Sequence, residues 1–147
     1  MDKGNLTGML NDILQSGFFA VSCSFTGAQL KAGDDRICLL QSMVLLDTKY
    51  VTGFERKDFS ADSVLRYWES IRDDYSDRQS NMLKSAIQYL TDAFQVRDKG
   101  LKKINIPIVV YISDVAMDAG IIPTFFRRWW EVLISMQNTS IIWDSDG

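Results

Sequence analysis

The fold of this chain depends on how one stretch is interpreted, Met43-Val44-Leu45-Leu46-Asp47-Thr48-Lys49-Tyr50-Val51. Four apolar residues precede a carboxylate and an ammonium group that are two positions apart. On a β-strand, side chains two positions apart lie on the same face. A strand here would therefore place Asp47 beside Lys49, and a charged pair next to an apolar strand is a first indication of chemistry.

Two hairpins fit this part of the chain. The turn is either Gln41-Ser42, with strands 36–40 and 43–54, or Asp47-Thr48, with strands 37–46 and 49–55. Neither turn has the Asn-Gly or Asp-Gly signature of a tight hairpin, so the register between residues 36 and 56 stays open. Only the first hairpin keeps Asp47 and Lys49 on a strand; in the second they flank an ordinary turn, where aspartate is favoured.

The remaining elements follow from hydrophobic spacing. Helical spacing predicts a helix over 6–15, one opening at Ser60, a periodic stretch from Met82 to Gly100, and one capped by Thr124; the two middle stretches form either one long helix or two joined near 76–80. Alternating or continuous apolar residues predict strands over 18–25, 104–114 and 140–143, with a loop over 26–35. We therefore expect an α/β fold, a single domain over 1–147 with a mixed central β-sheet flanked by helices.

Composition limits the classes of function. A chain of 147 residues that is 46% hydrophobic can form one compact core, and its net charge of −3 differs from the positive charge usual in nucleic-acid modules. No apolar run approaches the roughly 18 residues needed to cross a bilayer, and the first residues do not resemble a secretion signal. We expect a soluble cytoplasmic protein with no membrane partner.

The chain contains no histidine and two cysteines. Catalytic triads, histidine-bearing zinc sites and four-thiolate zinc sites are therefore excluded. Cys23 and Cys38 both lie in apolar runs, where a buried, inert thiol is the usual outcome. Any catalysis must rest on carboxylates, lysines, tyrosines or a hard metal ion.

The N-terminal third resembles the PD-(D/E)xK nuclease superfamily, most closely its Holliday-junction-resolvase-like members. The resemblance lies in Ile13 to Val21 with its Gly17-Phe18, the loop from Gly27 to Gly33, Asp35, and Val44 to Lys49 with its Asp47-x-Lys49 motif. It implies a restriction-endonuclease-like αβββαβ order and a Mg²⁺-dependent endonuclease acting on nucleic acid. By the family pattern Asp35 and Asp47 would hold Mg²⁺, and Lys49 would be the third catalytic residue.

A second class of function stays open beside the nuclease. A non-catalytic protein-binding or regulatory protein, immunity-like and built on a degenerate nuclease fold, suits the acidic charge and abundant aromatic residues, with a protein partner instead of nucleic acid. For either class, a homodimer is also open. A third possibility is a faint similarity of 108–120 to the strand-to-helix corner of anti-sigma-factor-antagonist domains. The sequence leaves open whether the chain is an enzyme.

Two basic clusters have simpler interpretations. Arg127-Arg128-Trp129-Trp130 could contact phosphates and stack on bases, but packing is favoured, with Phe126, Trp129, Trp130 and Leu133 facing the core and the arginines covering the edge. Lys99, Lys102 and Lys103 are expected to be a loop of solvated lysines.

Overall fold

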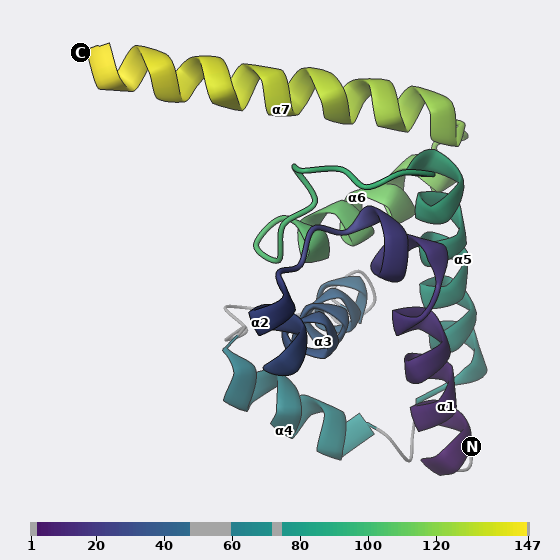
Figure 1. Ribbon diagram of the computed structural model, residues 1–147. Helices are drawn as coiled ribbons and strands as arrows, with labels where there is room; N and C mark the ends of the chain where they lie inside the picture. The colour runs from purple at the N-terminus through teal and green to yellow at the C-terminus, as the bar shows by residue number, and fades with distance from the viewer. Residues whose placement is uncertain (1–2, 48–59, 72–74, 147) are drawn as a thin grey trace.

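Helices make up the regular structure of this protein in the part of the chain that the computed structural model describes, residues 3–47, 60–71 and 75–146 (Figure 1). In chain order the elements are α1 (Lys3–Leu14), the π-helix η1 (Phe18–Ser22), α2 (Gly27–Lys31), α3 (Asp34–Asp47), α4 (Ala61–Ile71), α5 (Asp77–Ala93), α6 (Ile106–Asp118) and α7 (Pro123–Asp146). The predicted α/β fold with a mixed central β-sheet, and with it the αβββαβ order, is wrong, because the described residues contain no strand.

Helix α3 lies at the centre of the fold, and its residues were wrongly predicted to form a β-hairpin. It contacts α1, α2, α4, α5 and α6, and its buried residues extend around most of its circumference: Cys38, Leu39, Leu40, Ser42, Met43, Val44 and Leu46. A helix surrounded in this way is apolar all round and shows no amphipathic period, so its sequence looks like that of a buried strand. Both hairpins are therefore wrong over 36–47; their remaining residues, 48–56, lie outside the described part of the chain.

The predicted strand over 18–25 begins with η1 instead. The backbone N–H of Cys23 donates to the carbonyl of Phe18 at 2.9 Å, which closes a π-helical turn. Phe18 and Phe19 are both buried, whereas Val21 is exposed, so the expected alternation of buried and exposed residues is absent. This segment is helical because both adjacent rings pack against the core. A short run of alternating apolar residues in the sequence does not reveal such packing.

The strand predicted over 104–114 is largely helix α6. Pro107 lies in the first turn of α6, where its missing N–H leaves no hydrogen bond unmade. The helix packs on both α3 and α5, and its exposed side also carries apolar residues, Ile108 and Val115, so its apolar run is continuous. The segment 108–120, compared above with a strand-to-helix corner, therefore contains no strand.

The other helices were predicted correctly in type and approximate place. α1, α4 and α5 match the periodic segments, and the alternative of two separate middle helices is confirmed, because the hydroxyl of Ser76 accepts from the N–H of Gln79 and caps α5. The loop predicted over 26–35 contains the short helix α2, which Thr26 and Gln29 cap in the same reciprocal way.

An aromatic cluster joins the N-terminal, middle and C-terminal parts of the core. The ring of Phe94, just after α5, lies 6.3 Å from the rings of Phe18, Phe126 and Trp130, centroid to centroid. These contacts hold both the first part of α7 and η1 against α5. The strand predicted over 140–143 is wrong, since those residues belong to α7.

Helix α7 differs from the others in its position. Figure 1 shows it running across one end of the molecule, opposite the end where α4 lies, with its C-terminal part continuing past the other helices. None of the helices in the described part of the chain is long and apolar enough to cross a membrane.

Candidate functional site

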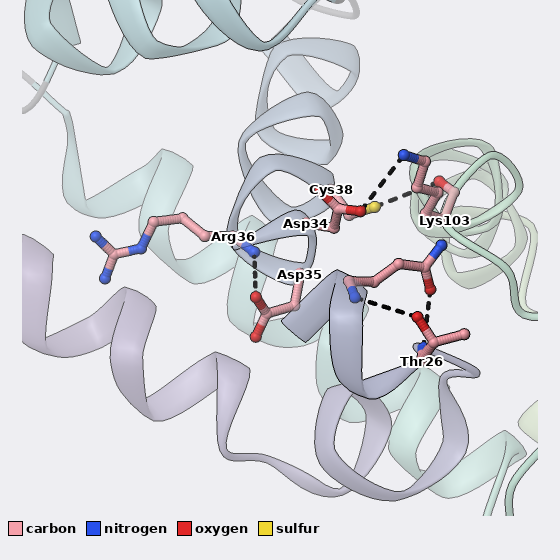
Figure 2. Close-up of polar contacts among 7 residues, drawn as sticks. Thr26, Asp34, Asp35, Arg36, Cys38 and Lys103 are labelled. Atoms are coloured by element: carbon pink, nitrogen blue, oxygen red, sulfur yellow. Dashed lines mark hydrogen bonds and ion pairs between the residues drawn. The ribbon is translucent and has the colours of Figure 1, made fainter. Parts of the chain in front are cut away.

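Asp35 lies in the first turn of α3 and is half-buried. Its carboxylate accepts a hydrogen bond from the backbone N–H of Arg36 at 2.9 Å, and Figure 2 shows Asp35 apart from Asp34, which faces Lys103 at 3.4 Å. Carboxylates in the first turn interact favourably with the positive end of the helix dipole. The position of Asp35 is thus explained by its place in the first turn of α3.

Asp47 is the last residue of α3 and is held by two neighbouring segments. The hydroxyl of Tyr67, on α4, donates to one carboxylate oxygen, and the side-chain amide of Gln79, on α5, donates to the other at 3.0 Å. The nearby ring of Tyr75 is buried, and burial together with the charge of Asp47 raises the pKa of its hydroxyl. Asp47 therefore links α3, α4 and α5.

The structure does not bring the predicted metal ligands together. Asp35 and Asp47 are twelve positions apart on one helix, which is about 18 Å at 1.5 Å per residue, whereas ligands of one Mg²⁺ ion each lie within about 2.1 Å of it. Lys49 lies outside the described residues. Among the described residues, no three histidine, cysteine, aspartate or glutamate side chains are grouped to hold a metal ion. The nuclease hypothesis stays a prediction, and the geometry gives it no support.

The two cysteines are buried and unpaired with each other, as expected. Burial, and then the nearby charge of Asp34, raises the pKa of the Cys38 thiol to about 12. Burial also raises the pKa of Cys23. Both thiols stay protonated at neutral pH and are poor nucleophiles.

The first half of α7 has one apolar face turned to the core. Phe126 and Trp130 are buried, and Leu133 is half-buried against the same cluster. The indole N–H of Trp130 also donates to the carboxylate of Asp98 at 3.4 Å. This is the packing face that the sequence predicted, with one exception: Trp129 was expected to face the core and does not.

A second apolar face of α7 is exposed. Phe125, Trp129, Val132 and Met136 are between 41% and 60% exposed, and they follow one another at intervals of four, three and four positions. At 100° per residue, this spacing places them in one narrow row along the helix. We call these four residues the α7 stripe.

Charged residues occupy the remaining side of α7. Arg127 pairs with Glu131 at 3.3 Å, and Arg128 is exposed beside them. The arginines lie near the N-terminal end of the helix, whereas Asp144 and Asp146 lie in its last turn. In the sequence, the N-terminal part of the helix is therefore basic and its last turn is acidic.

Sequence reasoning missed the α7 stripe, although the signal was present. Two apolar sets interleave in one helix, 126/130/133 and 125/129/132/136. They differ by about 100° around the axis, so a single core cannot cover both without surrounding the helix. One of the two sets had to be exposed or covered by something else.

Comparison of the chain with known protein families, curated proteins and solved structures finds no match.

Proposed function

We propose that this chain is a non-catalytic protein-binding protein, and that its α7 stripe packs against the α7 of a second copy. The observation that carries the proposal is the exposure of two aromatic rings, a valine and a methionine in one row on a helix whose other apolar face is already buried. Large contiguous apolar surfaces on a protein usually mark an interaction site. Aromatic residues and methionine are also enriched in the centres of interfaces.

The spacing of the α7 stripe favours a helix as the partner. Intervals of four, three and four are those of the apolar seam in a coiled coil, where each side chain fits between side chains of the facing helix. In the sequence the same intervals continue from Met136 through Thr139 to Trp143. A helix of 24 residues is long enough to present several turns of such a seam.

The charges favour an antiparallel second copy. In that orientation the basic N-terminal part of one α7 lies against the acidic C-terminal turn of the other, and the helix dipoles are also opposed. The opposite charges of the two helix ends then become complementary between helices. The same patch would serve both copies, as in a twofold-symmetric dimer.

The expected dimer is weak. Burying the exposed half of one such side chain contributes roughly 1 kcal/mol, so eight of them, four from each copy, contribute roughly 8 kcal/mol. Association costs about 4 to 15 kcal/mol in lost freedom of motion. The gain and the cost are of the same order, so we expect association to be weak and to depend on protein concentration.

Sedimentation velocity over about 1 µM to about 1 mM tests the proposal. The wild-type chain should pass from monomer to dimer with rising concentration, and Val132→Asp should hold it at the monomer, because a carboxylate in the seam loses its hydration. The matched control is Leu65→Asp, an exposed apolar residue on α4, at the opposite end of the molecule (Figure 1), which should dimerise like the wild type. A wild-type chain that stays monomeric, or a control that dissociates as Val132→Asp does, overturns the proposal.

A further inference from the structure

A pocket of about 920 Å³ lies beside the loop between α5 and α6 and is strongly cationic. Arg97, Lys99, Lys102 and Lys103 all line it. They are four of the 16 lysines and arginines in a chain whose net charge is −3. This concentration of positive charge is therefore a local property, opposite in sign to the chain as a whole.

Little within the pocket neutralises these charges. Lys103 has a partner in Asp34 at 3.4 Å, whereas Lys99 and Lys102 have no carboxylate partner among the described side chains. The acidic residue of the loop, Asp98, is engaged elsewhere: its carboxylate accepts from the backbone N–H of Gly100 at 2.8 Å and from the indole of Trp130. The ammonium groups of Lys99 and Lys102 are therefore available to bind a ligand.

The loop that carries the cations is held in place by its backbone. The N–H of Ser24 donates to the carbonyl of Leu101 at 2.8 Å, and the N–H of Asp98 donates to the carbonyl of Ser22 at 2.9 Å. The side chain of Leu101 is fully buried, and the amide of Asn105 donates to the carbonyl of Gly100 at 2.9 Å. The attachment points of the lysines are therefore fixed before a ligand arrives, which lowers the entropy lost on binding.

Neutral donors complete the wall of the pocket. Thr26 and Gln29 line it, and each uses only its oxygen in the cap of α2, as the acceptor of a backbone N–H. The threonine O–H and the glutamine NH₂ remain available as donors. Ammonium groups beside hydroxyl and amide donors match the oxygen atoms of a phosphate.

We infer that this pocket binds a ligand carrying two or more phosphate groups through Arg97, Lys99, Lys102 and Lys103. Two unpaired ammonium groups and a third shared with Asp34 provide charge for more than one phosphate. The exposed side chain of Ile104, 77% accessible at the rim, offers an apolar surface for the rest of the ligand. The site does not involve the α7 stripe and is independent of dimer formation.

Isothermal titration calorimetry of the full chain with inorganic pyrophosphate, and separately with a single-stranded oligonucleotide, tests the inference. Binding of pyrophosphate assigns the site to free phosphorylated compounds, and binding of the oligonucleotide alone assigns it to the phosphates of a nucleic acid. In either case, Lys99→Gln with Lys102→Gln should weaken binding by about tenfold or more. Affinity should also fall as salt rises, since bound phosphates release counterions.

A charge-matched variant serves as the control. Arg66→Gln with Lys84→Gln removes the same charge from α4 and α5, outside the pocket, and should bind like the wild type, while circular dichroism confirms that both double variants are folded. Failure of both probes to bind overturns the inference. Equal weakening in the two double variants overturns it as well, because binding would then follow net charge and not this pocket.

Discussion

The hydroxyl of Tyr67 donates a hydrogen bond to the carboxylate of Asp47, which joins the end of α3 to α4. Gln79 donates to the second oxygen of the same carboxylate at 3.0 Å and brings in α5. The residue that the sequence favoured as a metal ligand thus has both oxygens engaged in holding three helices together. Its main role in this geometry is structural.

Removal of this carboxylate should destabilise the fold. Asp47→Ala leaves the Tyr67 hydroxyl and the Gln79 amide without their charged acceptor, and a hydrogen bond to a charged group contributes about 1.5 to 3 kcal/mol. We expect a loss of about 2 to 3 kcal/mol in the free energy of unfolding, measured by urea denaturation. Asp35→Ala is the matched control and should lose only about 0.5 to 1 kcal/mol, the value of a carboxylate near a helix N-terminus. Equal losses in the two variants would contradict the assigned role of Asp47.

Gly100, in the α5–α6 loop, lies close against side chains of α7. A Cβ atom placed there would lie 3.1 Å from the side chains of Ile134 and Trp130, so these side chains must shift by a few tenths of an ångström in a packed region. We expect Gly100→Ala to lower the free energy of unfolding by about 1 kcal/mol or more, as in other crowded cores, in thermal unfolding followed by circular dichroism.

A second glycine provides the control for this crowding. Gly8 lies inside α1, and a Cβ there would meet no atom within 4 Å. Gly8→Ala should therefore stabilise the protein by about 0.5 to 1 kcal/mol through its higher helix propensity. If both alanine variants shift the unfolding temperature in the same direction, the contact between Gly100 and α7 is not as described.

Alkaline pH should destabilise the protein through its cysteines. The pKa of Cys38 is raised from 9.0 to about 12 in the folded chain, chiefly by burial, and burial likewise raises the pKa of Cys23. Above pH 9 the unfolded chain releases thiol protons that the folded chain keeps, so stability is retained below that pH and falls as pH rises. Each thiol contributes a slope of up to about 1.4 kcal/mol per pH unit.

Urea denaturation between pH 8 and 11 measures this slope, and Cys38→Ala isolates the contribution of one thiol. The variant should show a smaller decline with pH than the wild type, whatever its stability at pH 8. An unchanged slope in Cys38→Ala would show that other groups cause the alkaline loss.

Helices with one polar face were predicted correctly from the sequence, whereas helices without a polar face were predicted as strands. α4 has its charged residues on one side, and its limits were found to within a few residues. α3 is enclosed by other helices, and the exposed side of α6 carries the apolar residues Ile108 and Val115, so no polar face gives their sequences a helical period. Their β-branched and aliphatic residues then resemble buried strands. The position of Pro107 was the one local signal that favoured a helix start in α6.

The candidate site shows the same limit. Asp47-x-Lys49 drew attention because a strand would align the pair, whereas Asp47 ends a helix and Lys49 lies outside the described residues. Predicting the α7 stripe would have required knowing which of the two apolar faces of α7 the core covers. Phe126 and Trp130 are buried because Phe94 lies opposite them, and such a contact between distant parts of the chain leaves no mark in the local sequence.

The central claim, an antiparallel pair of α7 helices, is tested most directly by distances between spin labels on two copies. Labels are attached at Ser135→Cys and, in a second sample, at Arg128→Cys; the native thiols are buried and react slowly. With the pair centred near residue 134, the two labels at 135 should be about 3 Å apart along the helix axis and those at 128 about 18 Å apart. Equal distances at the two positions would contradict the antiparallel arrangement, and the absence of any coupling between copies at concentrations near 1 mM would contradict the interface itself.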